Sequence, residues 1–162
     1  MAFTRFILPI ILLLFPFIKA APQAPTSTPT PICSPQSSLR VVSPTQGSTI
    51  TQLKTTSLDP TNIEIIYCSG QYFKTRTVDI SVWLTRPEHI NGGVLLAKGV
   101  HPDNKDAQAG FSSYRFNVTI APWGGSYGTG ERVLRFYETT TGFYTAMNFQ
   151  INSVNVTLAT SG

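Results

Sequence analysis

The stretch TVDISVWL, from Thr77 to Leu84, decides the fold class because its aliphatic side chains alternate with polar ones and a tryptophan. Neighbouring side chains of a β-strand point to opposite sides, so this stretch predicts a strand with one aliphatic face. That face is made of Val78, Ile80, Val82 and Leu84. The opposite face holds Asp79, Ser81 and Trp83, and we expect Trp83 to be covered as well.

The sequence on both sides of this strand repeats the same kind of pattern. From Leu39 onward, short runs rich in Val, Ile, Phe, Tyr and Thr alternate with turns that contain Gly, Pro, Asn and Asp. No run of a dozen residues keeps a helical period. Strands are predicted at 39–42, 62–68, 77–84, 94–98, 114–120, 132–138 and 144–158. About seven short strands at regular spacing indicate an all-β protein built as an antiparallel β-sandwich.

The last predicted strand changes its phase halfway along. Its apolar residues stand at odd positions first and at even positions afterwards, namely Met147, Phe149 and Ile151 and then Val154, Val156 and Leu158. A β-bulge, which inserts one extra residue into a strand, would let both sets face the core. The sequence therefore predicts a bulge near Asn152 and Ser153.

Two N-glycosylation motifs lie on predicted strands, Asn117-Val118-Thr119 and Asn155-Val156-Thr157. An N-linked sugar has to sit on the surface. The alternation of side chains places both asparagines opposite the aliphatic residues of their strands. We therefore expect a sugar on at least one of Asn117 and Asn155.

The first residues are typical of a secretory signal peptide. Arg5 places a positive charge before the apolar run FILPIILLLFPFI, from Phe6 to Ile18. This run is too short for a transmembrane helix, which needs about 20 residues, so no stable membrane anchor is expected. Cleavage is expected after Ala20, which removes residues 1–20 and makes the mature protein a secreted, extracellular one.

The mature chain is expected to have two parts. Residues 21–38 are rich in Pro, Ser and Thr, cannot bury apolar surface and are expected to be flexible. Their hydroxyl groups could carry O-linked sugars, with an unmodified flexible N-terminus as the alternative. The β-sandwich domain is predicted over 39–162.

The charge of the mature chain excludes one class of partner. The whole chain has a net charge of +4, but the leader contains Arg5 and Lys19, so the mature net charge is only +2. The mature chain has no basic stripe of the kind that binds phosphates. Nucleic acid is therefore not an expected partner.

Cys33 and Cys68 are the two cysteines of the chain. An even count in an oxidising compartment allows one intramolecular pair, and we expect these two residues to form a disulfide bond. The alternative is that Cys33, placed in a mobile tail, pairs with another molecule.

Catalytic motifs are scarce, and the protein is expected not to be an enzyme. Residues 124–128, GGSYG, match the G-x-S-x-G pattern of a nucleophile elbow. No histidine follows Ser126 and no helix is predicted after it, so we interpret the motif as a glycine-rich hairpin loop. Asp79 and Glu138 could converge as a pair of acids, which leaves a cryptic glycan hydrolase as a minor alternative.

Neither a metal nor a cofactor is expected. His89 and His101 have no cysteine partners at the spacing of a structural zinc site. The acidic turn with Asp103, Asn104 and Asp106 lacks the glycine and the distal glutamate of an EF-hand loop. We interpret it as a solvated turn.

Aromatic residues in predicted loops are the remaining candidates for ligand contact. Trp123 and Tyr127 lie in the loop APWGGSYGTG, and Tyr72 and Phe73 lie in another turn. Aromatic rings with a polar edge suit sugar or protein surfaces. The alternative is that these rings fill the ends of the core.

Three motifs carry a family resemblance: VVSPTQGSTI at 41–50, VDISVWLTRP at 78–87 and NFQINSVNVTL at 148–158, with a GG-bearing loop before the closing strands. On these motifs the chain resembles small secreted proteins of mushroom-type fungi that carry one immunoglobulin-like domain. It is similar, more distantly, to the N-terminal domain of Ser/Thr-rich, GPI-anchored fungal cell-wall proteins linked to β-glucan assembly. The resemblance spans about 39–158, implies an immunoglobulin-like sandwich and brings no catalytic residues with it.

These expectations together favour a secreted, non-enzymatic binding or structural module associated with the cell wall. Its partner is expected to be a wall glycan or an extracellular protein. A GPI anchor is not expected, because no hydrophobic tail follows Leu158. The alternative is a secreted effector or inhibitor that binds a protein through a strand edge or a loop.

Overall fold

The computed structural model describes residues 31–35, 40–52, 60–70, 75–89, 92–121, 128–142 and 147–160. These residues form β1 (Val41–Ser43), β2 (Ser48–Gln52), β3 (Thr61–Gly70), β4 (Arg76–Thr85), β5 (Val94–Val100), β6 (Phe111–Ile120), β7 (Gly130–Thr141) and β8 (Met147–Thr160). No helix that is long and apolar enough to cross a membrane is found in these ranges.

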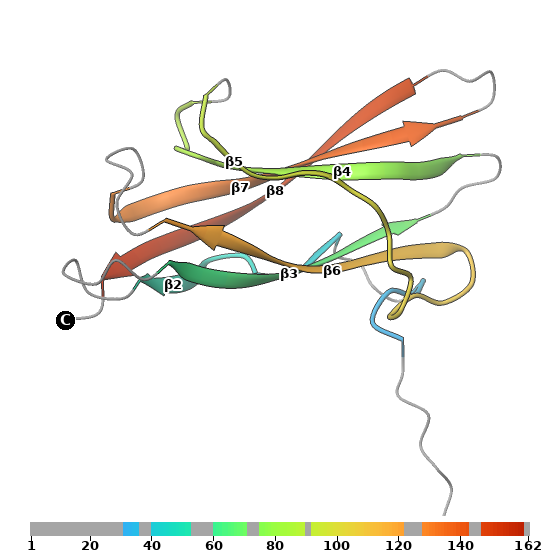
Figure 1. Ribbon diagram of the computed structural model, residues 1–162, viewed down its shortest axis with the longest axis horizontal. Helices are drawn as coiled ribbons and strands as arrows, with labels where there is room; N and C mark the ends of the chain where they lie inside the picture. The colour runs from blue at the N-terminus through green and yellow to red at the C-terminus, as the bar shows by residue number, and fades with distance from the viewer. Residues whose placement is uncertain are drawn as a thin grey trace, which may run out of the picture.

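The strands form two sheets that face each other (Figure 1). One sheet has three strands in the order β1-β3-β6, and the other has five in the order β2-β8-β7-β4-β5. Neighbouring strands are antiparallel except β2 and β8, which run parallel. The predicted all-β sandwich is confirmed, and its immunoglobulin-like connectivity stays a prediction.

The core lies between the sheets and is built from the alternating positions that the sequence pattern indicates. In β4 the predicted aliphatic face contributes Ile80, Val82 and Leu84, which are all buried. At the centre, the ring of Tyr67 in β3 stacks on Phe136 of β7 at a centroid distance of 5.4 Å. Tyr114 of β6 meets Tyr67 edge-on at 5.9 Å. These three rings join the two sheets.

The sequence pattern misses β2, because its five residues, Ser48-Thr-Ile-Thr-Gln52, include a single aliphatic side chain. Pairing with the second half of β8 decides its structure and places Ile50 in the core between the sheets. The preceding turn contains Gly47 at a φ of +76°, a left-handed conformation that favours glycine. The Gly47 N–H donates to the carbonyl oxygen of Asn155 at 2.8 Å, which starts the parallel pair.

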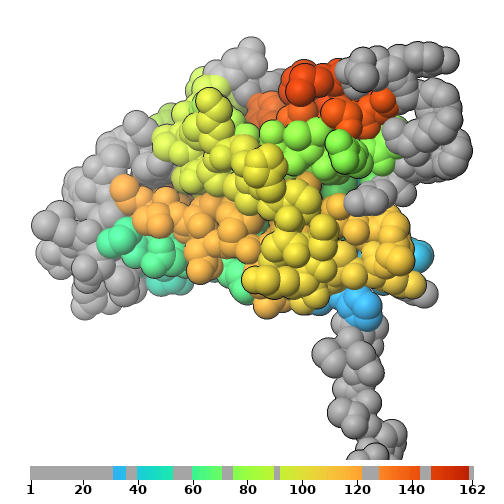
Figure 2. All heavy atoms as spheres, turned by 45° about the vertical axis from the view of Figure 1, so that its right-hand side comes forward, coloured from blue at the N-terminus to red at the C-terminus, as the bar shows by residue number. Residues whose placement is uncertain are grey.

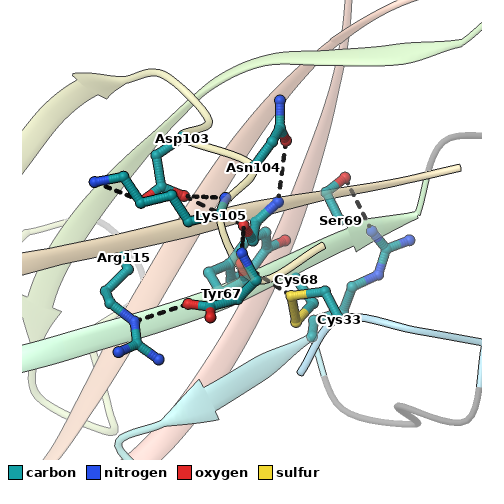
Figure 3. The surroundings of a disulfide bond; sticks show 11 residues. Cys33, Tyr67, Cys68, Ser69, Asp103, Asn104, Lys105 and Arg115 are labelled. Atoms are coloured by element: carbon teal, nitrogen blue, oxygen red, sulfur yellow. Dashed lines mark hydrogen bonds and ion pairs between the residues drawn. A yellow bond between two sulfur atoms is a disulfide. The ribbon is translucent and has the colours of Figure 1, made fainter. Parts of the chain in front are cut away.

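A disulfide bond joins Cys33 to Cys68 of β3, as predicted, and fixes the segment before β1 to the three-stranded sheet (Figure 3). The Cys33 N–H also donates to the Asp106 carbonyl oxygen at 2.9 Å, and the Gln108 N–H donates to the Cys33 carbonyl oxygen at 2.8 Å. Cys33 and Ser34 are consequently buried. Both lie within residues 21–38, whose other described residues are Pro31, Ile32 and Pro35.

Candidate binding face

The loop aromatics singled out from the sequence lie outside the described residues. This applies to Trp123 and Tyr127, to Ser126 of the GGSYG motif, and to Tyr72 and Phe73. Their part in ligand contact stays a prediction. The described strands offer a different candidate surface.

β8 runs straight through the position at which the sequence pattern predicts a bulge. Its pairing with β7 is continuous from Leu158, opposite Gly130, to Met147, opposite Thr141, without a register shift. The predicted bulge near Asn152 and Ser153 is therefore wrong. The odd-numbered apolar residues of β8 point outward instead: Met147, Phe149 and Ile151 are 62%, 71% and 54% exposed.

The outer side of the five-stranded sheet carries further apolar side chains, with polar ones between them. Ile151 lies beside Tyr137 of β7, whose neighbour on β4 is Ser81. Trp83 of β4 lies between Arg135 of β7 and Leu95 of β5, which is 39% exposed. Tyr137 and Trp83 are half-buried, so Trp83 is less covered than predicted. We call this surface the outer apolar face, made of Leu95, Trp83, Tyr137, Met147, Phe149 and Ile151. The orange-red β7–β8 hairpin that carries part of it lies at the surface in Figure 2.

The first half of β8 also has a free edge. β2 pairs with β8 only between Val156 and Thr160. The turn before β2 adds two hydrogen bonds at Asn155, whose carbonyl oxygen accepts from the Gly47 N–H and whose N–H donates to Gln46 Oε1. Within the described ranges, no strand pairs with β8 from Met147 to Val154 on the side away from β7.

Both sequon asparagines are exposed on outward faces. Asn117 lies on β6, on the outer side of the three-stranded sheet, and Asn155 lies on β8, on the outer side of the five-stranded sheet. The hydroxyl of Thr119, in the first sequon, donates to Asn62 Oδ1 at 2.9 Å. The surface position that an N-linked sugar requires is therefore met at both sites, and glycosylation itself stays a prediction.

A buried carboxylate lies between the sheets, on the inner side of β7. Glu138 is 1% exposed, and its oxygens accept hydrogen bonds from the hydroxyl groups of Tyr67, Ser69 and Thr77. The guanidinium of Arg40 adds an ion pair at 3.5 Å. Asn152 Nδ2 donates to the Tyr67 hydroxyl at 2.6 Å. We call these residues the Glu138 cluster, which joins β3, β4, β7 and β8 and the residue before β1.

Glu138 and Asp79, the two acids named as a possible pair, lie on the neighbouring strands β7 and β4. The register places Asp79 beside Thr139, whereas Glu138 lies beside Ile80. The hydrolase alternative stays a prediction. Both carboxylate oxygens of Glu138 are already engaged by donors in the core. A carboxylate held by these donors links strands of the two sheets.

The acidic turn between β5 and β6 is held by its own side chains (Figure 3). Asp103 Oδ1 accepts from the Lys105 N–H at 3.3 Å and from the Ser113 hydroxyl at 3.2 Å. Asp106 Oδ2 pairs with Arg115 Nε at 2.9 Å. Among the described residues, no group of three or more His, Cys, Asp and Glu side chains could hold a metal ion.

Two buried tyrosines make the fold sensitive to alkaline pH. Burial, followed by the hydrogen bond to Glu138 and its charge, raises the pKa of Tyr67 far above its ordinary value of 10.0. Burial and the charge of Glu138 raise the pKa of Tyr114 in the same way. Above pH 10 the unfolded chain therefore loses two tyrosine protons that the folded chain keeps, and the unfolded state is favoured.

The expected result is a free energy of unfolding that is unaffected by these tyrosines below pH 10 and falls above it. The loss is about 1.4 kcal/mol per pH unit for each buried tyrosine. Denaturant unfolding at several values between pH 8 and pH 12 measures it. A Tyr114→Phe variant should lose stability about half as steeply; an unchanged slope in this variant would contradict the prediction.

Comparison with known proteins gives no assignment for this chain. No protein-family model matches it, and no curated protein is found to be similar to it. The functional argument therefore depends on the geometry of the outer apolar face, the free edge of β8 and the Glu138 cluster.

Proposed function

We propose that this protein is a secreted, N-glycosylated and non-enzymatic binding module of the fungal cell wall, which contacts a wall glycan through the outer apolar face. The observation that carries the proposal is the exposure of Phe149 and Ile151 on the first half of β8, a regular strand whose second half buries Val154, Val156 and Leu158 in the core. Contiguous exposed apolar surface on a soluble domain marks an interaction site.

The opposite side of the sandwich has a different character. There Arg115 of β6 forms ion pairs with Glu64 at 3.7 Å and with Asp106 at 2.9 Å. Asn117 and the hydrogen-bonded pair of Thr119 and Asn62 occupy the same side. The ion-paired and hydrogen-bonded groups on that side find their partners within the protein, whereas the outer apolar face leaves Phe149 and Ile151 open to solvent. The contrast favours the five-stranded sheet as the ligand side.

The shape of the outer apolar face suits an extended ligand. Its side chains stand on neighbouring strands of one sheet, and Trp83 and Tyr137 combine an apolar ring with a polar edge, which suits the surface of a sugar. One shallow pocket among the described residues is lined by Gly47, Pro87 and Asn155, away from Phe149 and Ile151. A polymer that lies across the Met147–Ile151 half of β8, clear of the predicted sugar on Asn155, therefore fits these exposed side chains.

The test is retention of the mature protein on insoluble β-glucan and on chitin. Phe149→Ala and Tyr137→Ala should each weaken binding about tenfold, because each removes a ring contact worth roughly 1.4 kcal/mol. Phe111→Ala is the matched control, since Phe111 is a half-buried ring on the other sheet. A Trp123→Ala variant measures any contribution of the predicted loop site.

Two results would overturn the proposal. One is that the wild-type protein is not retained on any wall polymer. The other is that Phe149→Ala and Tyr137→Ala bind as well as Phe111→Ala, which would place the ligand away from the outer apolar face.

A further inference from the structure

We propose that the free edge of β8 pairs with the same edge of a second copy of this chain. The two β8 strands would run antiparallel, and the two five-stranded sheets would become one continuous sheet across a twofold axis. This inference concerns the edge of the sheet and does not depend on glycan binding by its face.

The backbone N–H and carbonyl groups at the free edge of β8 are available for strand pairing. Asn155 directs its N–H and its carbonyl oxygen away from β7, towards the turn before β2. The direction of the backbone N–H and carbonyl groups alternates along a strand. The same groups of Met147, Phe149, Ile151 and Ser153 therefore also point away from β7. In the part of the chain that the structure describes, these groups have no strand beside them. An unpaired row of donors and acceptors is a template for another strand.

The edge also lacks the features that keep exposed strands apart. Monomeric proteins protect such edges with charged side chains, proline or a bulge. The segment Met147–Ser153, MNFQINS, contains no charged residue, no proline and no glycine. Its pairing with β7 has no register shift, so no bulge twists the edge away.

One register uses the whole free edge. In an antiparallel pair centred on Gln150, Phe149 faces Ile151 of the second copy, and Met147 faces Ser153 of the second copy. Every edge-directed residue then meets another edge-directed residue, as a hydrogen-bonded ladder requires. A register shifted towards the C-terminus would oppose Met147 to Asn155, whose backbone groups are already bonded to Gln46 and Gly47.

The side chains on the outer side support the same arrangement. The aromatic ring of Phe149 and the β-branched Ile151 of the second copy would be direct cross-strand neighbours, a favourable pairing. Asn155 stands on this same outer side of β8. A sugar there would project away from the sheet and hinder face-to-face stacking of two copies, but it would leave the plane of the sheet free.

The first test is the molar mass of the mature glycoprotein by sedimentation or light scattering at increasing concentration. The expected value rises to twice that of the monomer. Ile151→Pro should keep the protein monomeric, because its ring replaces an edge-directed N–H while the β7 ladder stays intact. Ile151→Lys should do the same through charge, and both variants should keep the far-ultraviolet circular dichroism of the wild type.

The second test places a cysteine at the twofold axis. Facing residues of a non-hydrogen-bonded antiparallel pair have Cα atoms about 4.5 Å apart, within the range of a disulfide bond. Gln150→Cys should therefore form a covalent dimer under mild oxidation. Asn148→Cys is the matched control, since its copy would lie about 13 Å away along the strand, and it should not crosslink.

The proposal is overturned if the wild-type protein stays monomeric up to about 1 mM, where even a millimolar association would show. It is also overturned if Ile151→Pro dimerises like the wild type, or if Asn148→Cys crosslinks as readily as Gln150→Cys. Specific binding of a different protein to the edge of a domain that stays monomeric would likewise overturn the proposed pairing of two copies.

Discussion

Replacement of Glu138 by alanine is expected to lower the free energy of unfolding by about 3–5 kcal/mol, because buried hydroxyl groups that lose their acceptor cost about 1–3 kcal/mol each. The carboxylate accepts from Tyr67, Ser69 and Thr77 in the core. The Arg40 guanidinium is 37% exposed and can turn to water instead. Equilibrium denaturation followed by tryptophan fluorescence measures the loss.

Glu131→Ala is the matched control for this prediction. Glu131 lies on the same strand as Glu138 but is exposed, so its removal should change the stability by no more than about 0.5 kcal/mol. Equal effects of the two substitutions, or a loss below 1 kcal/mol for Glu138→Ala, would show that the Glu138 cluster does not hold the sheets together.

The sandwich could be predicted because its strands obey one simple rule over most of their length. In β6, for example, Tyr114, Val118 and Ile120 are buried while Arg115 and Asn117 are exposed, as alternation requires. The sandwich needs a buried face on each strand, so hydrophobic period alone identifies the strands and places the sequons on the surface.

The same rule fails where an apolar residue does not face the core. The bulge expected in β8 follows from the assumption that Phe149 and Ile151 must be buried, and the structure exposes both. β2 was missed for the converse reason, since Ile50 is its one aliphatic residue and pairing with β8 places it in the core. At such positions, burial and strand pairing depend on contacts between distant segments of the chain. The local pattern of apolar and polar residues does not reveal those contacts.

The Glu138 cluster shows what can and what cannot be predicted from the sequence. Alternation in β7 places Glu138 on the same side as Leu134 and Phe136. Its burial was nevertheless not predicted, and Glu138 was named only as a possible partner for Asp79. The real partners, Tyr67 and Ser69, are about 70 positions earlier, with separations of 71 and 69. These residues meet Glu138 only because the two sheets face each other.

Removal of the disulfide bond by the double substitution of Cys33 and Cys68 with serine is the other large expected effect. A cross-link that closes a loop with a sequence separation of 35 restricts the unfolded chain. The chain-entropy estimate for such a loop is about 4 kcal/mol. Thermal and denaturant unfolding of the double variant should show a loss of that size.

The position of the disulfide bond adds a local prediction to the global one. Apart from the bond, Cys33 is held by two backbone hydrogen bonds, to Asp106 and from Gln108. Hydrogen bonds of this kind contribute about 0.5–1.5 kcal/mol each, less than the roughly 4 kcal/mol expected of the cross-link. Amide hydrogen exchange at Cys33 and Gln108 should therefore become fast in the double variant, while exchange in the centre of β7 stays slow.

Reduced wild-type protein is the control that separates the cross-link from the substitutions. If the constraint on the unfolded chain is the cause, reduction should reproduce most of the loss seen in the double variant, because both remove the same closed loop. A small effect of reduction beside a large effect of the serines would point to their polar hydroxyls at two buried positions, Cys33 and Cys68. In that case packing around the sulfur atoms, and not loop closure, would be what stabilises this end of the sandwich.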